Sequence, residues 1–65
     1  MNNMFIDYEI VMELLGVKKT KAYDIIAKLN KELEEKGFLT QRGRVVATYF
    51  YERYGVEYKQ LNLVA

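Results

Sequence analysis

Apolar residues recur at helical spacing in two neighbouring parts of the chain. The first series, within residues 10–15, follows Asp7, a good helix N-cap, and stops at Gly16, which suits a left-handed helix C-cap. The second series predicts a longer helix from about Lys19 to Lys36. Its apolar stripe consists of Ala22, Ile25, Ile26, Leu29 and Leu33. The opposite side of this helix presents Thr20, Asp24, Ala27 and Lys31.

A turn signal follows the long helix. Gly37 ends that helix, and residues 38–41 and 44–46 then flank the pair Arg42-Gly43. Because glycine readily adopts a positive φ angle, this stretch predicts a short β-hairpin. Arg42 is expected at its tip, with a second arginine just beyond it.

Aromatic residues dominate the next predicted element. Thr48 is the expected N-cap of a third, short helix, and Gly55 closes it. Aromatic side chains at helical spacing beside a hairpin are typical of a core, so we expect burial of Phe38, Tyr49, Phe50, Tyr51 and Tyr54. Stacking of exposed tyrosines on RNA or single-stranded DNA is the alternative, and the accessibility of Tyr49 and Tyr51 distinguishes the two.

The turn between the first two predicted helices is tight. Gly16 supplies the turn, Val17 points back toward the core, and residues 18–21 open the second helix. This is the arrangement of a helix-turn-helix, whose second helix enters a DNA groove, and the hairpin takes the place of a wing. We therefore expect a mainly α fold with a small β-hairpin, a winged helix-turn-helix of three helices plus wing. We expect a single domain, 1–65, with its core at 5–55 and tails at 1–4 and 56–65.

The composition is that of a small folded domain and offers little for catalysis. The chain has 65 residues, 51% of them apolar and 29% charged, and it contains no His, Cys, Ser or Trp. Nucleophilic triads and the usual zinc sites need those residues, and no glycine-rich phosphate loop is present. Glu32, Glu34 and Glu35 share a helix with lysines, so we interpret them as a solvated face. We expect no enzyme, cofactor, metal or small-molecule ligand.

Positive charge is concentrated in two places, although the net charge is only +1. Residues 17–30 carry four lysines against one aspartate, and residues 38–46 carry two arginines, whereas residues 1–16 are acidic. The two basic segments lie where a winged helix-turn-helix contacts DNA. No stretch has the length and apolar character of a membrane span, so we expect a cytoplasmic protein.

The lysine-rich start of the second predicted helix breaks a local rule. Cations there oppose the helix macrodipole, and a sequence selected only for folding would place Ser, Asp or Glu in that turn. DNA phosphates would supply the missing negative charge. Backbone contacts are therefore expected from Lys18, Lys19, Lys21, Lys28, Arg42 and Arg44, and base-edge contacts from Thr20 and Tyr23. Packing over the first helix is the alternative for Tyr23, and Asp24 is expected to pair with Lys21 or Lys28.

Several short motifs follow one another in a characteristic order. They are residues 13–17 (ELLGV), the lysine turn, residues 22–26 (AYDII), residues 37–40 (GFLT), residues 42–44 (RGR) and the closing Tyr54-Gly55. In this combination the chain, over about residues 5–55, resembles the excisionase and MerR-like winged helix-turn-helix proteins of phages and integrative elements.

The resemblance implies a role in DNA binding. It implies a major-groove helix carrying residues 18–21 and Tyr23, and a wing carrying Arg42 and Arg44. Members of the family bind DNA, often cooperatively, and some bend it to direct an integrase toward excision. Others act as small regulators of transcription.

Partners beyond DNA are expected because one small module makes few contacts. Specific binding then needs a second copy, a cooperative array or a partner such as an integrase. The apolar tail, residues 56–65, is the candidate for that contact. One alternative is a protein-interaction module that binds an integrase, repressor or host protein without DNA. The modest net charge and Asp24 favour that alternative.

Overall fold

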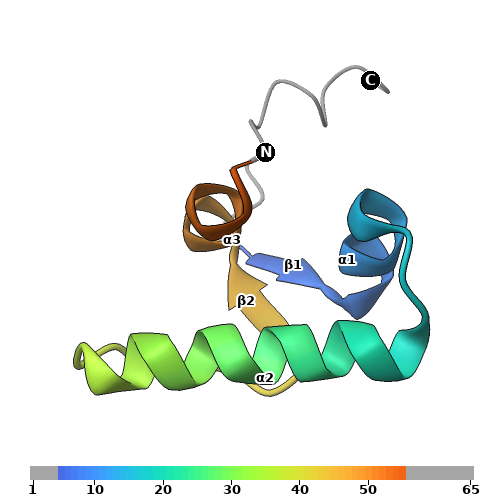
Figure 1. The fold of residues 1–65 in the computed structure, drawn as a ribbon. Coiled ribbons are helices and arrows are strands. Elements are labelled where there is room, and N and C mark those ends of the chain that lie inside the picture. Colours follow the sequence, from blue (N-terminus) through green and yellow to red (C-terminus); the bar gives the residue numbers. More distant parts are fainter. Residues whose placement is uncertain (1–4, 56–65) are drawn as a thin grey trace.

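The computed structural model describes residues 5–55 of the chain. In chain order its elements are β1 (Phe5–Asp7), α1 (Tyr8–Leu15), α2 (Lys19–Glu35), β2 (Arg44–Val46) and α3 (Ala47–Tyr54). Figure 1 shows α2 along one edge of the molecule, and α1, the two strands and α3 all lie on the same side of this helix. The mainly α, winged helix-turn-helix fold is confirmed. The predicted tails, 1–4 and 56–65, and the partner contact expected of the second tail lie outside the described residues.

The helix-turn-helix forms as its capping residues predict. The Asp7 Oδ1 atom accepts a hydrogen bond of 3.2 Å from the backbone N of Ile10, which caps α1. Gly16 ends α1 with a φ of 67°. The backbone N atoms of Gly16 and Val17 both donate to the carbonyl of Met12, over 2.8 and 3.2 Å. These bonds hold the turn against the end of α1 and direct the chain into α2.

The two strands come from distant parts of the sequence. β1 pairs with β2 in antiparallel register, and Ile6 lies opposite Val45 with both side chains fully buried. The predicted partner of β2 is therefore wrong, because residues 38–40 form no strand and Gln41 meets Arg44 only in a single β-bridge. None of residues 38–40 is buried, so pairing with β1 removes more apolar surface from water.

The C-terminal end of α2 is a Schellman motif. The backbone N of Gly37 donates to the carbonyl of Glu34, and that of Phe38 donates to the carbonyl of Leu33, each over 3.0 Å. Gly37 has a φ of 96°, which confirms the predicted helix end. The expected burial of Phe38 is wrong: this side chain is 58% exposed. The left-handed turn leads the chain along the surface, where no strand covers the ring.

The third helix follows β2 without a linker. Val46 is its N-cap residue and makes no side-chain cap hydrogen bond. The capping expected of Thr48 is therefore wrong, because the helix already begins at the buried Ala47 and Thr48 lies exposed in its first turn. Within residues 5–55 none of the three helices is long and apolar enough to cross a membrane.

Most of the predicted aromatic cluster is in the core. Phe50 and Tyr51 are buried, and Tyr49 is partly buried against the same core. Tyr54 is an exception, since it stacks one ring face on Phe50 with a centroid distance of 5.0 Å and remains 44% exposed. The largest fully buried side chains are those of Ile6, Val11, Ile26, Val45 and Phe50.

Candidate nucleic-acid interface

The first turn of α2 presents uncompensated positive charge. Lys18 is the N-cap residue in an extended conformation, and its side chain makes no cap hydrogen bond. The first turn contains no acidic residue, and Lys19, Thr20 and Lys21 are exposed. The first turn of α2 itself therefore contains no group that offsets the unfavourable interaction of these cations with the helix dipole.

Tyr23 links α2 to α1. Its ring stacks on that of Tyr8 with a centroid distance of 4.7 Å and an interplanar angle of 21°. The Nζ of Lys19 lies 5.3 Å from the Tyr8 ring centroid, within range of a cation–π interaction. Tyr23 is still 38% exposed. Tyr23 therefore packs over α1, which was the alternative to base contact, and the rest of its ring faces solvent.

The wing is a tight turn of residues 41–44. The backbone N of Arg44 donates to the carbonyl of Gln41 over 3.3 Å, and Gly43 adopts a φ of 80°. Arg42 and Arg44 are both exposed. A Cβ atom on Gly43 would lie 3.5 Å from Cε1 of Tyr23, so the wing backbone approaches the tyrosine closely.

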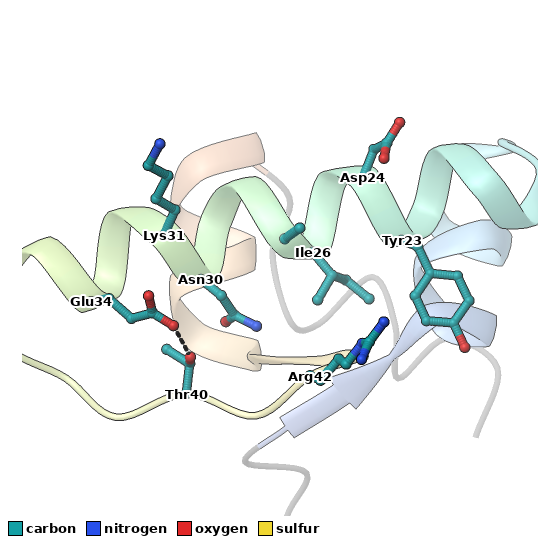
Figure 2. Close-up of a pocket in the computed structure, with 10 residues that line it drawn as sticks. Tyr23, Asp24, Ile26, Asn30, Lys31, Glu34, Thr40 and Arg42 are labelled. Carbon is teal, nitrogen blue, oxygen red and sulfur yellow. Dashed lines mark hydrogen bonds between the residues drawn. The ribbon is translucent and has the colours of Figure 1, made fainter.

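An open groove of about 970 Å³ separates α2 from the wing. It is lined by Tyr23, Asp24, Ile26, Ala27, Asn30, Lys31, Glu34, Thr40, Arg42 and Gly43. Figure 2 shows Tyr23 and Arg42 on the wing side of α2, whereas Asp24 and Lys31 extend away from the wing. The hydroxyl of Thr40 donates to the carboxylate of Glu34 at the far end of this groove.

The predicted contact residues do not all lie on one flank of α2. The groove brings Tyr23 and Arg42 together, but Lys28 lines a separate small cavity with Arg53 and Tyr54, beside α3. Asp24 is exposed and makes no ion pair within residues 5–55, so its expected pairing with a neighbouring lysine is wrong.

Asn30 is the residue that the sequence analysis missed. Its side chain is 7% exposed, and its Nδ2 donates to the carbonyls of Gln41 and Arg44 over 3.0 and 2.7 Å. The sequence does contain a signal, because Asn30 shares the buried side of α2 with Ile26 and Leu33. A polar residue on an apolar stripe usually has a hydrogen-bonding partner.

Glu32 joins α2 to α3. Its carboxylate accepts hydrogen bonds from the Tyr49 hydroxyl over 2.6 Å and from the Arg53 guanidinium over 2.8 Å to each oxygen. The bond to Arg53, and next the bond to Tyr49, lower the pKa of Glu32 to about 2. The same bond raises the pKa of Arg53 above its ordinary value. The solvated face expected for Glu32 is therefore wrong, because α3 brings two donors to it.

The accessibility of the α3 tyrosines bears on the base-stacking alternative. Tyr51 is 8% exposed, and Tyr49 is partly buried with its hydroxyl bound to Glu32. The Nζ of Lys36 covers the Tyr49 ring at 4.8 Å. These two rings therefore pack into the fold, which disfavours the base-stacking alternative.

The fold and this surface define a small winged helix-turn-helix protein with exposed cations on its second helix and its wing. The chain is 37% identical over 54 residues to the ICEBs1 excisionase of Bacillus subtilis (strain 168), and the match covers 83% of this chain and 84% of that protein. The chain belongs to the excisionase family of mobile genetic elements. Excisionases are accessory proteins without catalytic activity, so the expectation of a non-enzyme is confirmed.

No protein-family model matches the chain. No solved structure matches it either. The family assignment therefore rests on the excisionase relative, and the fold assignment on the structure described above.

Proposed function

We propose that this chain binds duplex DNA and acts as an excisionase, with α2 in the major groove and the wing on the backbone or in the minor groove. The observation that carries the proposal is the uncapped lysine turn, whose residues Lys18, Lys19 and Lys21 are all exposed. A helix that breaks the capping rule gains from an external anion, and DNA supplies phosphates at that position. The excisionase relative supports this role.

The exposed residues divide into backbone and base contacts. Lys18, Lys19 and Lys21 are exposed cations at the start of α2, which suits contacts to phosphate oxygens. Thr20 and Tyr23 are the candidates for base edges, and the Tyr8 stack holds the Tyr23 ring in one orientation. The remaining cations, Lys28, Arg42 and Arg44, flank these residues on the α3 side and on the wing.

Assembly with other molecules completes the proposal. A single helix and a single wing contact few base pairs, so a unique site requires a second copy or a larger recombination complex. By analogy with the excisionase relative, we place an integrase in that complex. Self-association on DNA belongs to the same proposal.

The test is fluorescence anisotropy of a labelled duplex, titrated with the protein at several salt concentrations. Six basic candidates limit the slope of log K against log salt to about −5, and we expect a slope of about −3 to −5. Lys19→Ala should reduce the magnitude of that slope by about 1. Absence of binding by the wild type at low salt would overturn the proposal and favour a protein-interaction module.

The matched control is Lys36→Ala. Lys19 is the first residue of α2 and Lys36 is the C-cap residue at its other end, and each covers a tyrosine ring, at 5.3 Å for Lys19 and 4.8 Å for Lys36. The two variants therefore lose the same charge and the same kind of contact. Only Lys19 lies at the candidate interface, so Lys36→Ala should leave the slope unchanged. Equal effects of the two variants would mean that the binding reflects net charge alone.

A further inference from the structure

Within residues 5–55, Asn30 is the only buried residue that is not classed as hydrophobic. Burying an amide without hydrogen bonds costs roughly 1–3 kcal/mol in proteins, so its partners matter. Both bonds of its Nδ2 run to backbone carbonyls of a distant segment, at sequence separations of 11 and 14. The amide is therefore a tertiary contact between α2 and the wing, independent of the α2 helix itself.

The two acceptors are the two ends of the wing turn. Gln41 and Arg44 begin and end this turn, and Arg42 and Gly43 lie between them. The turn's own backbone bond, from Arg44 to Gln41, is 3.3 Å long, whereas Asn30 reaches the same two residues over 3.0 and 2.7 Å. The side chain of Asn30 thus ties together two residues that the turn alone holds by a single long bond.

We propose that Asn30 is a positioning residue for DNA binding, which clamps the wing turn to α2 so that Arg42 and Arg44 stand at a fixed distance from the lysine turn. This inference rests on the proposed function. A wing ordered before binding loses less conformational entropy when its arginines meet the DNA. Asn30 itself is buried and does not touch the DNA.

The chemistry of the site restricts what can replace Asn30. Two N–H donors on one nitrogen serve two carbonyls, and an ionised aspartate of the same shape offers only acceptors. Alanine removes both bonds and leaves two carbonyls without this donor. Glutamine keeps both donors on a stem that is one methylene longer, so Asn30→Gln is the conservative variant that should rescue part of the effect.

The experiment uses the full chain and two readouts. The first is amide hydrogen exchange without DNA, in which Asn30→Ala should speed exchange of the Arg44 amide about tenfold or more, an opening expected when clamping bonds are lost. Glu35→Ala, an exposed substitution on the same helix, is the control and should not change it. An unchanged Arg44 exchange rate in Asn30→Ala would overturn the clamp.

The second readout is the salt dependence of duplex binding in a double-mutant cycle. Asn30→Ala should reduce the magnitude of the salt slope by up to about 2, the contribution of two arginine contacts. In the Arg42→Ala/Arg44→Ala background, Asn30→Ala should not reduce the salt slope further, because the wing then has no positive charge for Asn30 to position. A merely structural residue would weaken binding equally in both backgrounds, and that additive result would overturn the inference.

Two further outcomes are informative. If Asn30→Ala does not fold, Asn30→Ser, which keeps one donor, takes its place in both readouts with the same expected directions. If the wild type does not bind duplex DNA at low salt, the proposed function fails and the positioning role fails with it. If the wild type binds duplex DNA but the double-mutant cycle is additive, the proposed function stands and only the positioning role of Asn30 is overturned.

Discussion

Both ends of α2 carry charged side chains, but within residues 5–55 only those at the C-terminal end have hydrogen-bonding partners in the rest of the fold. At the C-terminal end, Glu32 has its partners on α3, and Glu34 its partner in the loop before the wing. At the N-terminal end, the lysine turn has no capping bond and no acidic neighbour in its first turn. The comparison teaches that satisfied polar groups on this helix hold the fold together, whereas the unsatisfied cations are available for a ligand.

The two lysines above tyrosine rings make this contrast within one residue type. Lys36 covers Tyr49 and lies close enough to Glu32 to help lower the pKa of that carboxyl. Lys19 covers Tyr8 in the same manner, and although Glu9 and Glu13 of α1 line the same shallow cavity, neither forms an ion pair with it within residues 5–55. A cation–π contact is thus common to both ends, and what separates them is the hydrogen-bonded carboxylate of Glu32 that lies beside Lys36.

The largest change in the free energy of unfolding should come from the C-terminal end of α2, where the charged side chains have partners within the fold. Gly37 has a φ of 96°, and space is open where a Cβ would lie. Gly37→Ala should therefore lower the free energy of unfolding by about 1–2 kcal/mol through backbone strain alone. Urea denaturation measures this loss, and Gly37→Asn, which tolerates the left-handed region better, should lose less. Gly37→Ala should leave the salt slope of DNA binding unchanged as long as the variant is folded. A changed slope would show that the C-terminal end of α2 also takes part in DNA binding.

A smaller effect of opposite sign should come from the lysine turn. Lys18→Asp supplies the missing N-cap and should raise the free energy of unfolding by about 1 kcal/mol. The same substitution places a negative charge against DNA phosphates, so duplex affinity should fall and the magnitude of the salt slope should drop by about 1. Lys18→Ala, measured by urea denaturation and fluorescence anisotropy alongside Lys18→Asp, should reproduce the drop in slope without the gain in stability. A stabilised variant with undiminished affinity would contradict the proposed interface.

The smallest effect at neutral pH should come from Glu32, because its pair with Arg53 is partly exposed to solvent. The folded-state pKa of about 2 lies below the ordinary value of 4.5, so this carboxylate stabilises the fold above pH 4.5. The contribution disappears as the pH falls toward 2. The difference in urea stability between wild type and Glu32→Gln should follow this course, with Glu35→Gln as the control. A difference independent of pH would show that packing, and not charge, joins α3 to α2.

Local rules in the sequence were enough for the helices and most of their ends, although not for the start of α3, where Val46 and not Thr48 is the N-cap residue. Asp7, Gly16 and Gly37 cap or end the helices where predicted, because capping depends on a few adjacent residues. The sheet was not predictable in the same way. Strand β2 is near the predicted position, but its partner β1 lies some forty residues earlier, and local pattern carries no information on which distant segment buries the most apolar surface.

The candidate site shows the same limit. Its cations were evident from the sequence, since exposed charges at a helix start and in a turn need no tertiary contact to be recognised. The Tyr8–Tyr23 stack and the two bonds of Asn30 were not, because each joins groups from different elements. The role of Glu32 was missed for the same reason, as its donors come from α3.

The sequence by itself therefore determined which helices form, where they end and that the lysine turn and the two wing arginines face solvent, since these properties follow from neighbours along the chain. Only the tertiary structure decided that β1 pairs with β2, that Glu32 has partners and that Asn30 holds the wing. Those outcomes depend on burying apolar surface and satisfying polar groups across the whole domain. Both requirements are met between residues that the sequence keeps apart.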